Sequence, residues 1–200
     1  MVNLFLVLLG AIAGRLCGGR IGNLRFLPLR AGLLVLVSYA WQWVLVRLIG
    51  GHPTSLIGLA FVGSYSLLLG FLWVNRGLPG LKLAFVGMIL NLGVTIANGG
   101  FMPITPQTLV DAHLERQGVA VGERVMGSKD ILLPPDRVQL GLLSDDLFVS
   151  WPIPLVFSPG DVLVALGAGI LVFRGTRPQV RGPWAAQADR SPGSTPTGAV

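Results

Sequence analysis

The run from residue 83 to residue 100 constrains the fold of this chain most, because it contains no charged residue. A helix of about 20 apolar residues spans the hydrocarbon core of a bilayer, and this run approaches that length. Asn91, Thr95 and Asn98 lie at positions i, i+4 and i+7, so they form one polar stripe on the predicted helix. Lipid cannot satisfy an amide or a hydroxyl, so we expect the stripe to face protein or trapped water.

The composition excludes an ordinary soluble domain. The chain is 52% hydrophobic and 12% charged, whereas about a quarter of the residues of a typical soluble domain are charged. Most acids lie between the fourth and fifth apolar runs, so the net charge of +6 indicates arginines next to a membrane rather than a nucleic-acid-binding face. Cys17 is the single cysteine, which excludes an intramolecular disulfide and a multi-cysteine metal cluster. We expect neither metal nor cofactor.

Five apolar runs predict an all-α integral membrane helical bundle with about five transmembrane helices. The predicted spans are residues 2–17, 31–47, 55–74, 82–100 and 158–174, with one extramembrane segment, residues 101–157, between spans 4 and 5. Residues 175–200 are rich in Pro, Gly, Ser, Thr and Arg and predict a disordered cytoplasmic tail. An alternative for residues 1–13 is a signal peptide that is cleaved after the small residues 11–13.

The basic residues predict the topology. A chain with its N-terminus outside and its C-terminus in the cytoplasm places most of its fifteen basic residues on the cytoplasmic side of a bacterial inner membrane. In the first loop, Arg15 and Arg20 together with the amides of Gly18-Gly19 offer a second interpretation, a phosphate clamp. The simpler interpretation is charge that sets topology and attracts anionic headgroups.

Small and polar residues suggest several contacts. Gly10-x-x-x-Gly14 permits a close helix approach, and Gly63, Ser66 and Gly70 predict a close-packing face on the third span. Gln42 in the second span indicates either a cavity or an interhelical hydrogen bond. Residues 108–117 predict a short amphipathic helix, on which Asp111, His113 and Glu115 make a solvated face rather than a metal site. Residues 139–149 are amphipathic and should lie on the membrane surface or cap the bundle.

Two motifs at helix ends have both a structural and a functional interpretation. Asn98-Gly99-Gly100, followed by Pro103, is typical of a helix C-cap, but a broken helix end also lines binding cavities in transporters. Ser158-Pro159-Gly160-Asp161 predicts an N-cap with Asp161 at the third helical position. That structural role is sufficient to explain an aspartate at position 161 without a functional role.

The chain resembles a family of uncharacterised bacterial multi-pass membrane proteins, known as a domain of unknown function. The resemblance extends from the N-terminal run to about Arg174 and implies no activity. Ser144 stands where the resemblance implies Gly, and Pro159 where it implies Ile. The residues that carry it are Gly14-Arg15, Gly18-Gly19-Arg20, Leu90-Asn91-Leu92, Asn98-Gly99-Gly100-Phe101-Met102-Pro103, Leu143-Ser144-Asp145-Asp146 and Phe157-Ser158-Pro159-Gly160-Asp161.

Three functions remain open. The first is a non-catalytic accessory component that docks a membrane-protein partner through residues 101–157. The second is a small-solute carrier or ligand-binding membrane protein with a polar site on span 4, to which Gln42 could add. The third, an intramembrane enzyme with Asp145, Asp146 and Asp161 as acids, lacks any recognisable catalytic motif. The candidate ligand-binding residues are Asn91, Thr95, Asn98, Gly99, Gly100, Asp145 and Asp161.

Overall fold

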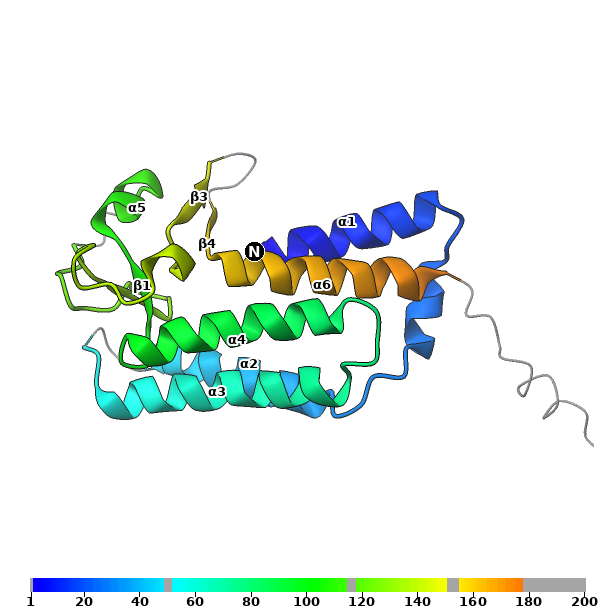
Figure 1. Cartoon of the computed structure of the whole chain (residues 1–200), viewed down its shortest axis with the longest axis horizontal. Coiled ribbons are helices and arrows are strands. Elements are labelled where there is room, and N and C mark those ends of the chain that lie inside the picture. Colours follow the sequence, from blue (N-terminus) through cyan, green and yellow to red (C-terminus); the bar gives the residue numbers. More distant parts are fainter. Residues whose placement is uncertain (1, 49–51, 115–117, 151–154, 178–200) are drawn as a thin grey trace, which may run out of the picture.

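The computed structural model describes residues 2–48, 52–114, 118–150 and 155–177, and it is mostly helical (Figure 1). Its five long helices are α1 (Val2–Leu16), α2 (Leu33–Leu48), α3 (Ser55–Val74), α4 (Leu81–Ala97) and α6 (Pro159–Thr176). They coincide with the five predicted runs, and the largest difference is the end of α4, at residue 97 instead of 100. Helices α3 and α6 are long and apolar enough to cross a membrane, while α1, α2 and α4 contain shorter apolar stretches.

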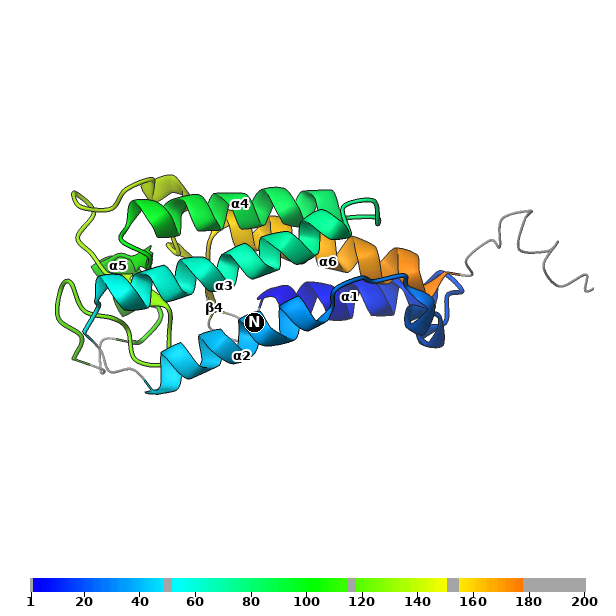
Figure 2. The ribbon, with the colours of Figure 1, turned by 90° about the horizontal axis from the view of Figure 1, so that it is seen from below.

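The helices pack in an order that differs from their order in the sequence. Helix α1 packs against α6, α6 against α4, α4 against α3, and α3 against α2 (Figures 1 and 2). Helix α6, the last helix of the described residues, therefore lies between α1 and α4. Buried apolar side chains at the contacts of α3, α4 and α6 form the largest core cluster, which comprises Tyr65, Leu68, Leu72, Leu81, Ala84, Met88 and Leu171.

Glycines allow α6 to approach both of its neighbours. A Cβ atom on Gly167 would lie 2.5 Å from the carbonyl oxygen of Gly80 in the turn before α4, and one on Gly10 of α1 would overlap the carbonyl oxygen of Gly169. A Cβ atom on Gly14 would likewise overlap Thr176. The close approach predicted from Gly10-x-x-x-Gly14 is therefore confirmed. Backbones this close gain van der Waals contact that longer side chains would prevent.

The predicted close-packing face of the third span is wrong. A Cβ atom on Gly63 would meet nothing within 4 Å, and one on Gly70 would make only an ordinary contact with Leu34. Ser66 is exposed. Helix α3 uses Gly58 instead, whose position is in contact with Gly99 and Gly100. Spacing identifies residues that share a helix face, but the neighbouring helices decide which face is covered.

Helices α2 and α3 are joined by polar side chains. The Ser38 hydroxyl donates to the carbonyl oxygen of Ser64 at 2.8 Å, and the Gln42 amide donates to the Ser64 hydroxyl at 3.0 Å. Ser38 and Ser64 are fully buried. For Gln42, the structure therefore shows the interhelical hydrogen bond, one of the two interpretations of its sequence position.

The described part of residues 101–157, which we call the cap, covers one end of the bundle (Figure 1). It contains β1 (Met102–Ile104), α5 (Pro106–Asp111), β2 (Asp130–Leu132), η3 (Gly141–Leu143), β3 (Leu147–Val149) and β4 (Leu155–Phe157). β1 pairs with β2 in parallel, with Met102 opposite Asp130, and β3 pairs with β4 antiparallel, with Leu147 opposite Phe157. These strands contradict a purely helical fold. Three-residue strands are too short to show an alternating pattern in the sequence.

Other expectations for the cap have mixed outcomes. Helix α5 ends at Asp111, well before the predicted end at residue 117, and His113 follows with a φ of 56°. Glu115 lies outside the described residues, among which no group of His, Cys, Asp and Glu is arranged to hold a metal ion. Residues 139–149 contain η3, which packs against α4 and α6, and β3, which packs against α5. The predicted disordered tail lies outside the described residues from residue 178 onward.

At the opposite end of the bundle lies η1 (Ile21–Phe26), which packs against α6 (Figure 2). Asn75, the C-cap of α3, binds the chain before α2. Its amide donates to the carbonyl oxygen of Arg30 at 2.8 Å, and its side-chain oxygen accepts from the Arg30 amide, also at 2.8 Å. These bonds fix the long loop between α1 and α2.

Candidate functional site

Asn91 joins α4 to the first turn of α6. It is buried, with 2% of its surface exposed. Its side-chain amide donates to Asp161 Oδ1 at 2.8 Å, and its side-chain oxygen accepts from the Ser158 hydroxyl at 2.9 Å. A Cβ atom on Gly160 would overlap that same oxygen. The part of the polar stripe at Asn91 therefore faces protein, as predicted from the cost of leaving an amide in lipid.

Asp161 closes a capping box at the start of α6. The Ser158 hydroxyl accepts from the Asp161 amide at 3.1 Å, and Asp161 Oδ2 accepts from the Ser158 amide at 3.4 Å. The carboxylate also lies at the positive end of the helix dipole. The N-cap predicted for this helix is confirmed, and the hydrogen bond from Asn91 connects it to α4. Ser158 was not a candidate site residue, although its position as N-cap was recognisable from the sequence.

The residues at the end of α4 form a helix C-terminus that also binds the cap, the described part of residues 101–157. Gly99 and Gly100 have φ values of 72° and 94°, in the left-handed region that glycine tolerates. The Gly100 amide donates to the Thr95 carbonyl oxygen at 2.8 Å. The Asn98 amide donates to the carbonyl oxygens of Val94 and Gln139, and its side-chain oxygen accepts from the Gln139 amide at 2.9 Å. The structural interpretation of this motif is thus observed.

Thr95 lies in the last turn of α4 and is buried, with 1% of its surface exposed. Its hydroxyl is 3.9 Å from the sulfur of Met102 in β1. Both Asn98 and Thr95 therefore contact residues that follow α4, whereas Asn91 contacts α6. The polar stripe of α4 is divided between two partners.

Asp145 and Lys129 form a buried ion pair in the cap. Lys129 Nζ lies 2.6 Å from Asp145 Oδ2 and 3.3 Å from Asp130 Oδ1. The Asp145 side chain is 6% exposed, and its Oδ1 atom has no hydrogen-bond partner among the described residues. The Asp145 amide donates to the Pro103 carbonyl oxygen at 3.2 Å, which ties this residue to β1. Sequence reasoning missed Lys129, because nothing local indicates a partner so far along the chain.

Burial raises the pKa of the Asp145 carboxyl to about 7, against the opposing charge of Lys129 and with a further contribution from Asp130 and Asp161. Burial lowers the pKa of Lys129, but the carboxylate of Asp145, with smaller contributions that include Asp130 and Asp161, raises it well above its usual value. Lys129 therefore stays charged, whereas Asp145 exchanges a proton near neutral pH. The effect of Asp161 on both groups connects the ion pair electrostatically to the start of α6.

Asp146, next to the ion pair, has a structural role. Its Oδ1 atom accepts from the Thr105 amide and from the Thr108 hydroxyl, both at 2.9 Å. Its Oδ2 atom accepts from the Ser144 hydroxyl at 2.6 Å. These bonds fix the start of α5 to the turn before β3.

We call Asn91, Lys129, Asp130, Asp145, Ser158 and Asp161 the junction cluster, because it lies where the cap meets the bundle. Asp130, Asp145 and Asp161 all act electrostatically on Lys129, and Asp130 also acts on Arg124. With three acids against two bases, this region favours a proton or a neutral or cationic hydrogen-bond donor over an anion. It brings together Asn91, Asp145 and Asp161 of the predicted site. Asn98, Gly99 and Gly100 at the end of α4 form their hydrogen bonds with other residues.

The comparisons with known proteins agree with the resemblance to an uncharacterised family. The model of the DUF5317 family, described as a family of unknown function, matches residues 26–173. A protein of Thermotoga maritima, described as uncharacterized, is 30% identical over 172 residues, which cover 85% of this chain and 88% of that relative. No solved structure matches significantly. With most of its length matched by the family model, the chain belongs to the DUF5317 family.

Proposed function

We propose that this protein is a multi-pass integral membrane protein in which α1, α2, α3, α4 and α6 are five spans. The distribution of polarity carries this proposal. Ser38, Ser64 and Asn91 are buried between helices, while Leu33, Leu56 and Leu59 are each more than two-thirds exposed. A soluble helical bundle buries its apolar stripe and exposes its polar face. The opposite distribution is stable where lipid is the solvent.

The two ends of the bundle differ in charge, which supports an orientation. The cap and the first turns of α3 and α6 lie at one end (Figures 1 and 2). The loop before α2, the turn before α4 and the last turn of α6 lie at the other. We propose that this other end is cytoplasmic in a bacterial cell membrane, since it holds the basic residues Arg15, Arg20, Arg25, Arg30, Arg76, Lys82, Arg174 and Arg177.

Fusions of alkaline phosphatase test the spans and the orientation together. The enzyme is active only outside the cytoplasm, so a fusion after Gln117 should be active and one after Gln179 inactive. Equal activity at both positions would contradict a membrane crossing by α6, the one proposed span between residues 117 and 179. The reversed pattern would contradict the orientation.

We propose further that the protein is a non-catalytic accessory component whose cap docks another membrane protein. Leu142 in η3 is 95% exposed, and Leu140, Leu147 and Val149 near it in sequence are also exposed. Their backbone is held by the Asn98–Gln139 bonds and by the pairing of β3 with β4. Exposed apolar side chains on a fixed backbone outside the lipid are typical of an interaction surface.

Photo-crosslinking tests the docking role. A photoreactive amino acid at Leu142 should give one protein adduct of defined mass in membranes, and Leu140→Asp in the same chain should abolish it. The control position is Met126, which is 72% exposed elsewhere in the cap. Adducts with lipid alone at Leu142 would show that the patch lies on the membrane surface and would overturn the docking proposal.

A second candidate function, binding of a small solute at the junction cluster, is favoured by the buried and unpartnered Oδ1 atom of Asp145. A hydrogen-bond donor such as an alkylamine would satisfy it. In detergent, methylamine should then raise the Tm of the wild-type protein and leave that of Asp145→Asn unchanged. An equal shift for both proteins, or none for the wild type, would rule out this site.

A further inference from the structure

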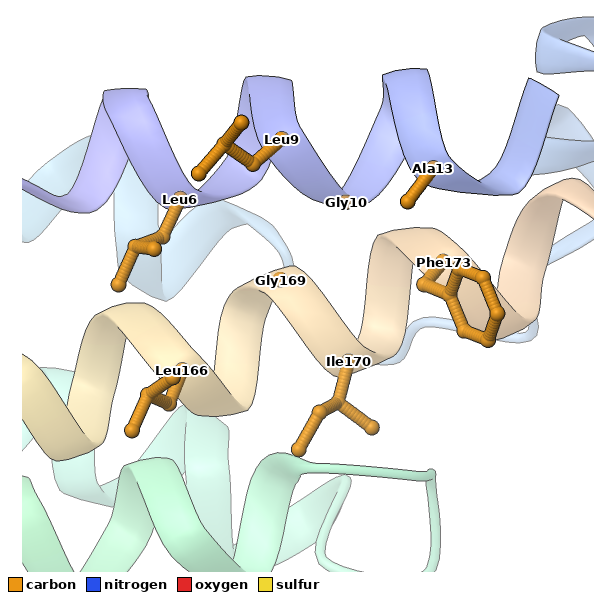
Figure 3. A pocket seen from close by; sticks show the side chains of 8 residues that line it. All are labelled: Leu6, Leu9, Gly10, Ala13, Leu166, Gly169, Ile170 and Phe173. Carbon is orange, nitrogen blue, oxygen red and sulfur yellow. The ribbon is translucent and has the colours of Figure 1, made fainter. Parts of the chain in front are cut away.

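A groove opens between α1 and α6 on the outside of the bundle (Figure 3). Its volume is about 270 Å³. It extends over eight residues of each helix, 6–13 and 166–173, which is about 10 Å at the rise of an α-helix. All of its lining residues are apolar: Leu6, Leu9, Gly10, Ala13, Leu166, Gly169, Ile170 and Phe173.

The small residues of the helix contact create this groove. Gly10 and Gly169 face each other, and Ala13 follows Gly10 by one turn (Figure 3). The larger side chains of Leu9 and Phe173 border the groove. The close approach of the backbones at the glycines leaves a depression that the neighbouring side chains do not fill. An apolar, elongated and outward-open depression matches a hydrocarbon chain in shape and polarity.

Arginines gather at one end of the groove. Arg174 follows the groove residue Ile170 by one turn on the same face of α6, and the Arg177 guanidinium lies over the ring of Phe173, 4.7 Å from its centroid. The Arg20 amide donates to the Thr176 carbonyl oxygen at 2.7 Å, which brings the loop after α1 to the end of α6. Arg15, Arg20, Arg174 and Arg177 are exposed, and no carboxylate pairs with them within the described ranges.

We propose that this groove binds an acyl chain of an anionic phospholipid whose phosphate is held by Arg20, Arg174 and Arg177. The inference rests on the proposed membrane location. Guanidinium groups bind phosphate through two parallel hydrogen bonds, and several uncompensated cations favour a headgroup that carries no cation of its own. The phosphate contacts come from side chains, because the Gly18 and Gly19 amides already donate to the carbonyl oxygens of Arg15 and Gly14.

Thermal unfolding in lipid nanodiscs tests the proposal. Nanodiscs of phosphatidylcholine are compared with nanodiscs that also contain phosphatidylglycerol, for the full-length protein. We expect phosphatidylglycerol to raise the Tm of the wild type by several degrees. The double variant Arg174→Gln/Arg177→Gln should lose this shift, and Ala13→Trp, which fills the groove, should reduce it.

Arg76→Gln is the matched control. The Arg76 guanidinium lies over Trp73, 4.0 Å from the ring centroid, at the same end of the bundle but on α3 and the turn that follows it. This variant should keep the phosphatidylglycerol shift. An equal shift in the double variant, or its loss in Arg76→Gln, would overturn the site in favour of general charge attraction.

Soluble glycerol phosphate tests whether the arginines bind a phosphate without an acyl chain in the groove. It carries the headgroup charge without an acyl chain and should not change the Tm at millimolar concentration. A stabilisation by glycerol phosphate that Ala13→Trp leaves intact would show a phosphate site without a lipid groove and would overturn the proposal. Failure of the five-span proposal would appear in the phosphatase fusions instead, so the two results are distinguishable.

Discussion

At the scale of single residues, Asn91 connects two helices that glycines have already brought close. Its amide group binds one acceptor and one donor of the first turn of α6. A buried amide with both ends satisfied contributes to stability, and its removal leaves the partner groups unpaired. In a membrane the net effect of each bond is modest, because alternative partners exist in the unfolded state.

Asn91→Leu should therefore lower the Tm in detergent more than Leu90→Ala does. Leucine cannot bind Asp161 or Ser158, and we expect a loss of about 1 kcal/mol per hydrogen bond. Leu90 is only half-buried and serves as the neighbouring control. Asn98→Leu should behave like Asn91→Leu, because it breaks the bonds to Gln139. A leucine variant that unfolds at the wild-type temperature would indicate that the stripe is hydrated rather than bonded.

The pKa of Asp145 predicts how stability depends on pH. Because this pKa is about 7 in the folded protein and 3.8 ordinarily, the folded state binds the proton more tightly than the unfolded state does. The contribution of Asp145 to stability is therefore largest below pH 4, falls as the pH rises to about 7, and is constant above that. Each pKa unit corresponds to about 1.4 kcal/mol.

Asp145→Asn should remove this dependence. Between pH 5 and pH 7 the stability of the wild type should fall relative to that of the variant by about 2 kcal/mol. Chemical unfolding in detergent at several pH values measures the difference. A difference between the two proteins that does not change with pH would contradict the assigned pKa.

At the scale of elements, the position of α6 depends on glycines in its neighbours as much as on its own. On α4, a Cβ atom at Gly87 would lie 2.5 Å from the Gly160 carbonyl oxygen and 2.7 Å from Leu163 Cβ. On the same helix, Gly93 is exposed and a Cβ atom there would meet nothing within 4 Å. Substitutions at these two positions therefore distinguish the effect of helix packing on stability from the effect of helix propensity.

Gly87→Ala should lower the Tm, because α4 and α6 must move apart to accommodate the methyl group. Gly93→Ala should leave it unchanged or raise it, since alanine favours a helix over glycine by about 1 kcal/mol. Thermal unfolding of the two variants in the same detergent measures this. Equal effects at the two positions would show that close packing does not hold α6 in place.

At the scale of the whole molecule, the cap is attached to the bundle by few but specific contacts. Asn98 binds Gln139 in both directions, Phe101 packs on Phe61 with ring centroids 6.0 Å apart, and Gly100 fits against Gly58. Two of these contacts involve the residues that end α4. The motif that stops the helix therefore also orients the segment that follows it.

Asn98→Ala should loosen the cap. We expect faster tryptic cleavage after Arg137, an exposed residue two positions before Gln139, in detergent-solubilised protein. The control is Asn23→Ala, which removes a hydrogen bond to the Thr176 carbonyl oxygen at the other end of the molecule. Unchanged cleavage in Asn98→Ala would show that the remaining contacts hold the cap without it.

The amino-acid sequence by itself determined where the five helices lie and how several of them end. Long apolar runs predict helices within a few residues, and Ser158 and Gly99-Gly100 predict the caps that the structure contains. These features depend on hydropathy and on hydrogen bonds between residues at most a few positions apart, so local patterns suffice to recognise them.

The tertiary structure alone decided which of these residues meet. Lys129 pairs with Asp145 and Asn91 with Asp161 across long stretches of chain, and β1 pairs with β2 although each has three residues. Gly63 and Gly87 both lie in apolar helices, yet of the two only Gly87 faces a neighbouring helix. Such contacts depend on the packing order of the helices, which places α6 between α1 and α4 and is not encoded in any local pattern.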